Sequence, residues 1–205
     1  MQTHLFSEFN DTKQNLLPCD GAAFYFGQVL DRADAAHYMQ TLLAGTDWQY
    51  DVVQVFGKTH VTKRQTAWYG DRDYLYTYSG VGRRALPWTA ELLELKTLVE
   101  NACGHTFNSC LLNLYHSGAE GMGWHSDDEA ELGPEPAIAS LSLGAERRFA
   151  FRHKTLKTDV QILLGNGSLL LMQGKCQSHW HHSLPKALRV KTARINLTFR
   201  KITGS

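Results

Sequence analysis

The second half of the chain limits the fold most strongly, because it contains a succession of short β-segments with no helix-length segment between them. Apolar, β-branched and aromatic residues cluster in short runs that are separated by turns containing Gly, Asp or Pro. A doubly wound fold requires helices that alternate with strands. The pattern therefore disfavours that fold and predicts two packed sheets of the jelly-roll type. Strands are expected at residues 52–56, 74–78, 109–115, 137–143, 148–152, 168–173 and 193–199.

Two helices are expected ahead of most of these strands. Asp31 is a suitable N-cap for a helix whose apolar residues recur at spacings of three and four and which ends at Gly45. Thr89 is a suitable N-cap for a second helix that has one apolar face and ends at Gly104. Both helices are interpreted as packing elements, so the predicted fold class is α+β.

The chain has the length and composition of one globular domain. Its 205 residues are 43% hydrophobic and 20% charged. We expect a single domain over residues 21–205, preceded by a polar, turn-rich extension over residues 1–20. No apolar run approaches the length of about 18 residues that a membrane helix needs, and the sequence has no secretory signal and no CxxC pair. These features predict a cytoplasmic monomer, or a nuclear one in a eukaryote, rather than a membrane protein.

The charges of the chain are segregated along the sequence, although the net charge is only +1. Residues 1–144 hold 9 Lys and Arg against 18 Asp and Glu, a balance of −9, and residues 145–205 hold 12 against 2, a balance of +10. Clustered cations bind phosphate by releasing counterions, so this asymmetry favours a polyanionic partner. Folding could also mix the two halves, and the charge alone leaves that open.

A candidate metal site begins with His125 and Asp127, whose side chains point to the same side of an extended segment. This pair alone would also suit a polar turn, and it needs a third ligand. His182 lies 55 positions after Asp127 (182 − 127), beside His179 and His181. Two histidines and one carboxylate form the facial arrangement of non-haem Fe(II) oxygenases. The same residues could hold zinc and activate water, so a zinc hydrolase is the alternative.

The C-terminal segment 194–200 has the strict period of two that is typical of a strand. Its apolar residues point to one side, and the other side carries two arginines with an amide and a hydroxyl between them. That polar side could be an ordinary solvent face, but it also suits a small dicarboxylate because arginine makes charge-assisted hydrogen bonds to carboxylates. The polar residues are Arg194, Asn196, Thr198 and Arg200, to which a neighbouring strand could add Asn113 and Tyr115.

Five segments of the chain carry a resemblance to a known family. They are Asn113-Leu114-Tyr115, His125-x-Asp127-Asp128-Glu129, Phe149-Ala150-Phe151-Arg152-His153-Lys154, His182-Ser183-Leu184-Pro185 and Arg194-x-Asn196-Leu197-Thr198-Phe199-Arg200. In this order they resemble the AlkB family of Fe(II)/2-oxoglutarate-dependent dioxygenases, in particular the branch that repairs alkylated duplex DNA. The resemblance runs from about residue 52 to the C-terminus. It implies a double-stranded β-helix (jelly-roll) core with a nucleotide-recognition hairpin within about residues 50–85.

The resemblance implies a role for each matching residue of the site. His125, Asp127 and His182 would bind Fe(II), with 2-oxoglutarate and dioxygen as cosubstrates. His182 is preferred to His179 and His181 because it occupies the His-Ser-Leu-Pro position. The residues that would hold 2-oxoglutarate are Asn113, Tyr115, Arg194, Asn196, Thr198 and Arg200.

The resemblance also implies contacts to a base that is rotated out of the duplex. Phe56 is expected at a hairpin tip, where it could wedge between base pairs, although a Phe packed into the core is the alternative. Tyr76 and Tyr78 would line the base pocket, while Trp68 and Tyr69 offer further stacking surfaces. Asp128 and Glu129 would meet the alkylated base, unless they form a solvated acidic turn. Phosphate contacts are expected from Lys58, Lys63, Arg64, Arg152 and Lys154, with Arg147 and Arg148 among further basic candidates.

The reaction implied by the resemblance is oxidative demethylation of N-alkylated DNA bases such as 1-methyladenine and 3-methylcytosine, which releases succinate, carbon dioxide and formaldehyde. Alkylated DNA, duplex and single-stranded, is the expected partner. A dioxygenase of the same fold that acts on RNA or protein is an alternative, beside the zinc hydrolase.

Overall fold

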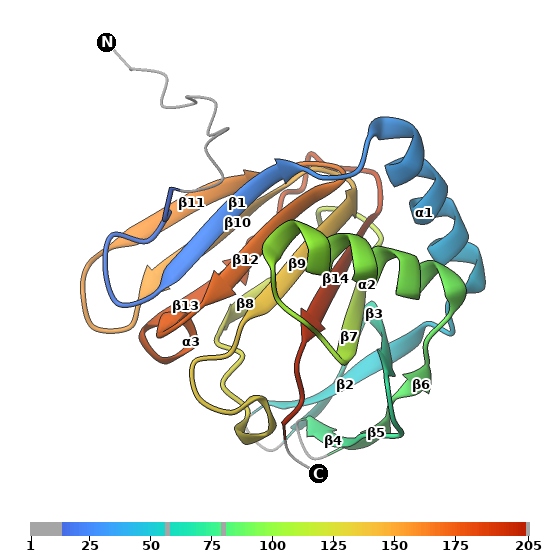
Figure 1. Cartoon of the computed structure of the whole chain (residues 1–205), viewed down its shortest axis with the longest axis horizontal. Coiled ribbons are helices and arrows are strands. Elements are labelled where there is room, and N and C mark those ends of the chain that lie inside the picture. The colour runs from blue at the N-terminus through green and yellow to red at the C-terminus, as the bar shows by residue number, and fades with distance from the viewer. Residues whose placement is uncertain (1–13, 56–57, 79–80, 204–205) are drawn as a thin grey trace.

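The protein consists of two facing β-sheets with two long helices on the outer side of the larger sheet (Figure 1). The structure, a computed structural model, describes residues 14–55, 58–78 and 81–203, including their side chains except those of residues 51–60 and 75–83. The larger sheet has the order β1-β12-β9-β14-β7-β3-β2, with β6 paired to β3. Its strands are β1 (Ala22–Gln28), β2 (Gln49–Val55), β3 (Lys58–Gly70), β6 (Leu86–Pro87), β7 (Ser109–Tyr115), β9 (Ile138–Gly144), β12 (Ser168–Gln173) and β14 (Arg194–Arg200).

The smaller sheet carries most of the residues that were predicted to bind metal. Its order is β11-β10-β13-β8, and a separate hairpin pairs β4 with β5. The bounds are β8 (Met122–His125), β10 (Arg147–His153), β11 (Asp159–Leu164), β13 (Trp180–Leu184), β4 (Leu75–Tyr78) and β5 (Val81–Arg84). Two short helical segments, η1 (Ala130–Leu132) and α3 (Cys176–His179), lie beside the metal-site residues in sequence. The predicted two-sheet fold of jelly-roll type is confirmed.

Both predicted helices form, and their caps are those expected. Helix α1 (Arg32–Gly45) begins after Asp31, whose side chain accepts from the backbone N–H of Asp34 at 2.8 Å. Helix α2 (Ala90–Cys103) begins after Thr89 and ends at Gly104. Gly104 has φ +74°, a left-handed conformation that favours glycine at a helix end. The helices cover one face of the larger sheet, which leaves its other face for the space between the sheets (Figure 1).

The alternation of β14 separates a helix-facing core from the space between the sheets. Ile195, Leu197 and Phe199 are fully buried and pack in the cluster that contains the apolar residues of α1 and α2. The alternate residues Arg194 and Thr198 are also buried, yet they lie on the opposite side. Strand period two predicted this division, and burial on both sides shows that the polar side is not a solvent face.

The register of the larger sheet aligns polar residues in rows across three strands. Arg194 of β14 lies opposite Tyr115 of β7, and Asn196 lies opposite Asn113. On the other side of β7, Thr66 of β3 lies opposite Asn113. The polar surface predicted for β14 and β7 therefore continues onto β3, a continuation that was not predicted from the sequence.

The N-terminal part of the chain contributes to the domain from residue 14 onward. Leu17 is 2% exposed, and the side-chain oxygen of Asn15 accepts from the backbone N–H groups of Leu17 and Ala23. Strand β1 then pairs with β12 at the edge of the larger sheet. Leu17 of the predicted extension is thus packed into the domain, and residues 1–13 lie outside the described residues. Among the described helices, none is both long and apolar enough to cross a membrane.

Candidate metal centre

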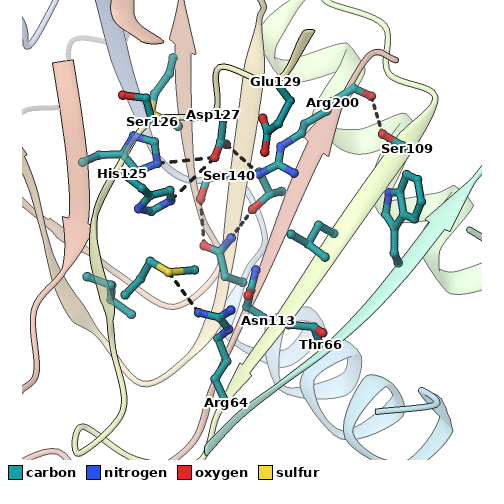
Figure 2. A pocket seen from close by; sticks show the side chains of 18 of the residues that line it. Arg64, Thr66, Ser109, Asn113, His125, Ser126, Asp127, Glu129, Ser140 and Arg200 are labelled. Carbon is teal, nitrogen blue, oxygen red and sulfur yellow. Dashed lines mark hydrogen bonds and ion pairs between the residues drawn. The ribbon is translucent and has the colours of Figure 1, made fainter. Parts of the chain in front are cut away.

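The three predicted metal ligands meet in a pocket between the two sheets, and Figure 2 shows His125 and Asp127 there. His125 ends β8, and Asp127 lies in the loop two residues further on. His182 is on β13 directly opposite His125 in the antiparallel pairing of these strands. His181 and His179 do not line this pocket. The strand register thus brings together two segments that are more than fifty residues apart in sequence.

The geometry of the three side chains suits a single small cation. One ligand atom from each residue lies within 4.8 Å of the others. Oδ1 of Asp127 is 3.7 Å from Nε2 of His125 and 4.0 Å from Nε2 of His182. The ring nitrogen Nδ1 of His125 contacts the carbonyl of Gly123 at 2.9 Å, which fixes the ring so that Nε2 faces Asp127. Metal-binding histidines are commonly oriented by such a bond from the second nitrogen.

The electrostatics keep Asp127 and His182 in the protonation states that a metal requires. Burial alone would raise the pKa of Asp127, but Arg200, His182 and His125 outweigh it and lower that pKa to about 2. Burial lowers the pKa of His182 to about 3. At neutral pH the carboxylate is therefore charged and the His182 imidazole is neutral, and both can coordinate a cation.

The pocket also fits a polar cosubstrate. Asn113 and Arg194 line it, and both carry a buried polar atom, Oδ1 of Asn113 and Nε of Arg194, that has no hydrogen-bond partner in the described part of the chain. Buried polar atoms are normally paired in folded proteins. Two imidazoles and one carboxylate are the donor set of non-haem Fe(II) sites. The residues present therefore fit Fe(II) together with a polar ligand that reaches Arg194.

All six residues predicted to hold 2-oxoglutarate line this pocket, but the two arginines differ in surroundings. Arg194 is 2% exposed, and its Nη2 donates to Ser142 Oγ at 2.9 Å and to Asn196 Oδ1 at 2.7 Å. Burial lowers the pKa of Arg194 to about 10, which leaves it charged at neutral pH. Arg200 instead donates to Oδ2 of Asp127 at 2.8 Å. The Cα atoms of Arg194 and Arg200 are six strand positions apart, which corresponds to about 20 Å. The two arginines therefore lie at opposite ends of the pocket.

The two acidic residues after the metal motif, Asp128 and Glu129, have different surroundings in the structure. Glu129 lines the pocket. Asp128 is exposed, does not line the pocket, and faces Lys154 Nζ at 3.8 Å, so its predicted base contact is not supported by this arrangement. Phe56 and the side chains of Tyr76 and Tyr78 lie outside the described residues.

Of the predicted phosphate contacts, Arg64 requires a correction. It is only 6% exposed, lines the pocket, and donates from Nη1 to the sulfur of Met122 at 3.1 Å (Figure 2). A guanidinium buried between the sheets cannot meet a DNA backbone on the surface. Arg64, Thr66 and Trp68 of β3 face the pocket, and alternate residues of a strand point to opposite sides. The neighbouring Lys63 therefore points away from the pocket and is exposed. Arg147 is also buried, at 1% exposure, and binds backbone carbonyls.

Two further basic candidates, Arg152 and Lys154, lie on the surface and have acidic partners. Arg152 makes two hydrogen bonds to Asp159, at 3.0 and 2.8 Å, and lies 4.4 Å from the ring centre of Trp124. Lys154 contacts the carbonyl of Gln177 at 2.9 Å as well as Asp128. The side chain of Lys58 is outside the described set.

Several pocket residues were not predicted as site residues. Thr66 and Trp68 follow Arg64 at a spacing of two on β3, and Ser140 lies on β9 beside β14. The period of two at 64, 66 and 68 was a usable signal, although Trp68 was considered only as a stacking surface. Ser140 donates to Asn196 Oδ1 at 2.9 Å, a contact across 56 residues that no local pattern indicates.

A second cluster of metal-ligand types, Cys19, Asp20 and His153, has hydrogen bonding that excludes a metal. Nδ1 of His153 accepts from the backbone N–H groups of Thr155 and Leu156, at 3.2 and 3.0 Å. The neutral ring therefore carries its proton on Nε2, which donates to Asp20 at 3.1 Å. A protonated nitrogen cannot coordinate a cation, so this cluster ties the N-terminal segment to β10.

Comparison with known proteins agrees with this site. Residues 22–200 match the profile of the 2OG-Fe(II) oxygenase superfamily, which extends the relationship ahead of the point near residue 52 that the motifs predicted. The chain is 44% identical over 158 residues to human DNA oxidative demethylase ALKBH2, covering 73% of this chain and 60% of the relative. It is 39% identical over 183 residues to bovine alpha-ketoglutarate-dependent dioxygenase alkB homolog 3, covering 84% and 63%. The chain thus spans about six-tenths of the length of these curated relatives.

A solved structure supports the fold assignment. The structure of OsALKBH1 superimposes with a TM-score of 0.62 at 18% identity and covers 90% of this chain and 99% of that one. Identity at this level supports the architecture alone. The predicted resemblance to AlkB-type proteins is confirmed by the similarity to the curated relatives. The expected requirement for Fe(II), 2-oxoglutarate and dioxygen is confirmed by the superfamily match, and the donor set of the pocket fits iron. The chain belongs to the 2OG-Fe(II) oxygenase superfamily.

Proposed function

We propose that this protein is an Fe(II)/2-oxoglutarate-dependent dioxygenase that removes N-alkyl groups from DNA bases, with 1-methyladenine and 3-methylcytosine as substrates. The observation that carries the proposal is that one pocket contains both the His125, Asp127 and His182 cluster and the buried Arg194. A hydrolytic zinc site has no need of a buried guanidinium at the far end of its pocket. The DNA demethylases and dioxygenases among its relatives support the substrate class.

The proposed roles of the residues follow from their positions. His125, Asp127 and His182 would hold Fe(II), and the metal with its cosubstrates supplies the oxidation of the N-methyl group. Arg194 would pair with a carboxylate of 2-oxoglutarate through charge-assisted hydrogen bonds. Arg200 would hold the Asp127 carboxylate in place. The remaining contacts to 2-oxoglutarate would come from Asn113, Tyr115, Asn196, Thr198 and the nitrogens of Arg200 that do not bond Asp127.

The alkylated base would enter the same pocket from the side of β3. Glu129 lines the pocket and offers a carboxylate to the positive charge or exocyclic amine of the damaged base. Trp68, 8% exposed on β3, offers a ring on which a base can stack. Tyr76 and Tyr78 remain proposed contacts on the basis of the family resemblance.

Mass spectrometry of a defined oligonucleotide tests the proposal. A duplex with one 1-methyladenine is incubated with the protein, Fe(II), 2-oxoglutarate, ascorbate and air. We expect loss of one methyl mass that depends on 2-oxoglutarate, with succinate formed in step. Asp127→Ala should abolish both products, whereas His181→Ala, which changes the histidine next to His182, should retain them. Succinate without repair would redirect the search to RNA or protein substrates, and an intact oligonucleotide without succinate would contradict the oxygenase assignment.

Preference for duplex DNA is the finer part of the proposal. Phe56 is expected to fill the gap left by the rotated base, so Phe56→Ala should reduce repair of duplex far more than repair of single strands. Equal losses on the two substrates would exclude this role. The surface cations Lys58, Lys63, Arg152 and Lys154 are proposed to contact phosphates.

A further inference from the structure

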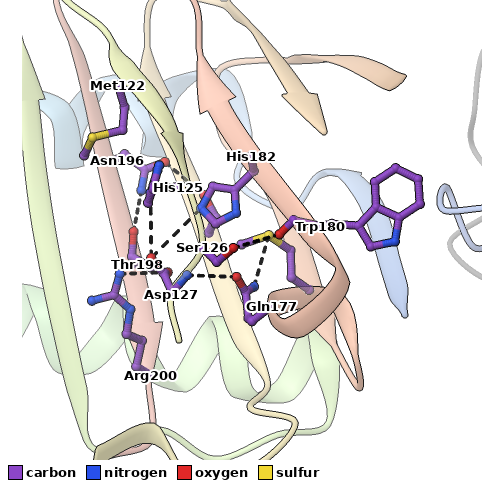
Figure 3. A network of polar contacts seen from close by, with 12 residues as sticks. Met122, His125, Ser126, Asp127, Gln177, Trp180, His182, Asn196, Thr198 and Arg200 are labelled. Atoms are coloured by element: carbon purple, nitrogen blue, oxygen red, sulfur yellow. Dashed lines mark hydrogen bonds and ion pairs between the residues drawn. The ribbon is translucent and has the colours of Figure 1, made fainter. Parts of the chain in front are cut away.

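The backbone of Asp127 is held by a side chain from another element, and this contact has no counterpart in the sheet pairing. Asp127 follows the end of β8, so its N–H has no strand partner there. Gln177 of α3 accepts that N–H through Oε1 at 3.0 Å (Figure 3). Asp127 is 4% exposed and Gln177 is 2% exposed. The bond is therefore buried, where an unpaired backbone N–H is costly.

Gln177 is poorly explained as a packing residue. Its neighbours Cys176 and Trp180 belong to the apolar cluster between the sheets. Among the described residues, its amide nitrogen faces only the weak acceptor Met172 Sδ, at 3.7 Å. An apolar side chain of the same volume would suit such surroundings better, since burial of an amide is unfavourable unless it is hydrogen-bonded. The strong hydrogen bond that the Gln177 side chain makes within the described chain is the one to Asp127.

A second bond ties the same two segments together. Ser126 Oγ donates to the carbonyl of Trp180 at 2.9 Å. Trp180 begins β13, the strand that carries His182. The loop that carries Asp127 is thus fastened at two successive residues to the turn that leads into the third ligand, as the dashed lines of Figure 3 show.

We propose that Gln177 is a positioning residue of the metal centre, which fixes the backbone of Asp127 relative to His182 and thereby sets the direction of the Asp127 carboxylate. This inference rests on the proposed metal site. Oδ2 of Asp127 is held by Arg200 from one side, and Gln177 holds the backbone of the same residue from the other (Figure 3). Loss of Gln177 leaves the carboxylate attached to Arg200 but free to shift away from the imidazoles.

Titration of the full chain with Co(II) after chelation, followed by visible absorption, tests this role without turnover. Gln177→Met keeps the volume and removes the acceptor. We expect about 10- to 100-fold weaker Co(II) binding, the usual effect of removing an outer partner of a metal ligand, and an altered band pattern at saturation. Ser126→Ala should weaken binding in the same direction. Ser178→Ala removes an exposed hydroxyl next to Gln177 that donates to the carbonyl of Lys175, away from the metal ligands, so this variant should bind Co(II) like the wild type.

The outcomes separate this inference from the proposed function. Wild-type affinity and spectrum in a folded Gln177→Met protein would refute the positioning role, even if its thermal midpoint fell. If the Gln177→Met protein does not fold, Ser126→Ala takes its place as the test. Unchanged Co(II) affinity in Ser126→Ala would then refute the proposal that the hydrogen bonds of Ser126 and Gln177 together position Asp127. Asp127→Ala is the test of the site itself: if it binds Co(II) as tightly as the wild type, the metal assignment fails and not the role of Gln177.

Discussion

Nη2 of Arg200 donates to Oδ2 of Asp127 at 2.8 Å, while Oδ1 of the same carboxylate faces His125 and His182. The two side chains are 12% and 6% exposed, so this ion pair is buried. Arg200 was predicted from the sequence as one of two arginines around a dicarboxylate. Arg200 lines the pocket as predicted, and its contact to Asp127 also joins the cosubstrate strand β14 to the metal loop, so that each depends on the other.

Arg200→Met should destabilise the metal-free protein, because the substitution leaves the charge of Asp127 buried without its partner. Removal of one member of a buried ion pair costs about 3 to 5 kcal/mol. Urea unfolding in the presence of chelator measures this loss. Lys201→Met changes an exposed neighbouring cation and should alter the free energy of unfolding by no more than about 0.5 kcal/mol. Equal effects of the two substitutions would show that the Arg200–Asp127 contact contributes little.

Arg194→Met should weaken binding of 2-oxoglutarate by about 10- to 100-fold, the equivalent of one charge-assisted hydrogen-bond interaction of about 1.5 to 3 kcal/mol. Calorimetry with the Co(II)-loaded protein in the absence of dioxygen gives this affinity directly. Co(II) affinity itself should stay unchanged, because Arg194 contacts Ser142 and Asn196 and none of the proposed ligands. Arg148→Met, an exposed cation on β10, is the matched control. A change of less than threefold in Arg194→Met would place the carboxylate elsewhere.

Arg147→Met should reduce stability, although sequence reasoning grouped Arg147 with surface phosphate contacts. Its Nη2 donates to the carbonyls of Glu120 and Pro185, both at 2.8 Å, which joins the loop before β8 to the loop after β13. Loss of both bonds leaves two carbonyls without this partner, and we expect a loss of about 2 kcal/mol or more in the free energy of unfolding. Arg148→Met should change it by less than about 0.5 kcal/mol. If the unfolding curves of Arg147→Met and Arg148→Met were indistinguishable, the structural role of Arg147 would be contradicted.

The elements that sequence predicted correctly are those whose signal is local. The caps Asp31 and Thr89 and the period of two in β14 each depend on residues within one element, and the structure has them as expected. The edge strand β1 was missed because its sequence AAFYFGQ shows no clean alternation and its register shifts between Tyr25 and Gly27. Strand β13 was missed for a related reason, since WHHSL carries two histidines where a strand pattern would be apolar.

Site residues could be predicted where they form short motifs of distinctive residue types. They could not be predicted where their role depends on which side of a strand faces the pocket. His125, Asp127 and His182 have distinctive residue types, and their partners in space follow from pairing of β8 with β13. Arg64 and Arg147 look like surface cations in sequence because charge does not reveal burial. Gln177 could not be identified, since its partner Asp127 is fifty positions away (177 − 127) and only the fold brings them together.

Lys63 and Arg64 are adjacent cations that point to opposite sides of β3, and they should differ in their effect on DNA binding. Lys63 is exposed, whereas Arg64 is 6% exposed within the pocket. Each phosphate contact contributes about 0.9 to the slope of log affinity against log salt concentration for duplex DNA. Lys63→Met should therefore lower that slope by about one, and Arg64→Met should leave it unchanged while impairing turnover through the pocket. Fluorescence anisotropy of a labelled duplex over a salt series measures the slopes. If Arg64→Met lowered the slope and Lys63→Met did not, the side chains of β3 would have the opposite orientation, and the pocket would lose the row that links Thr66 to Asn113 and Asn196.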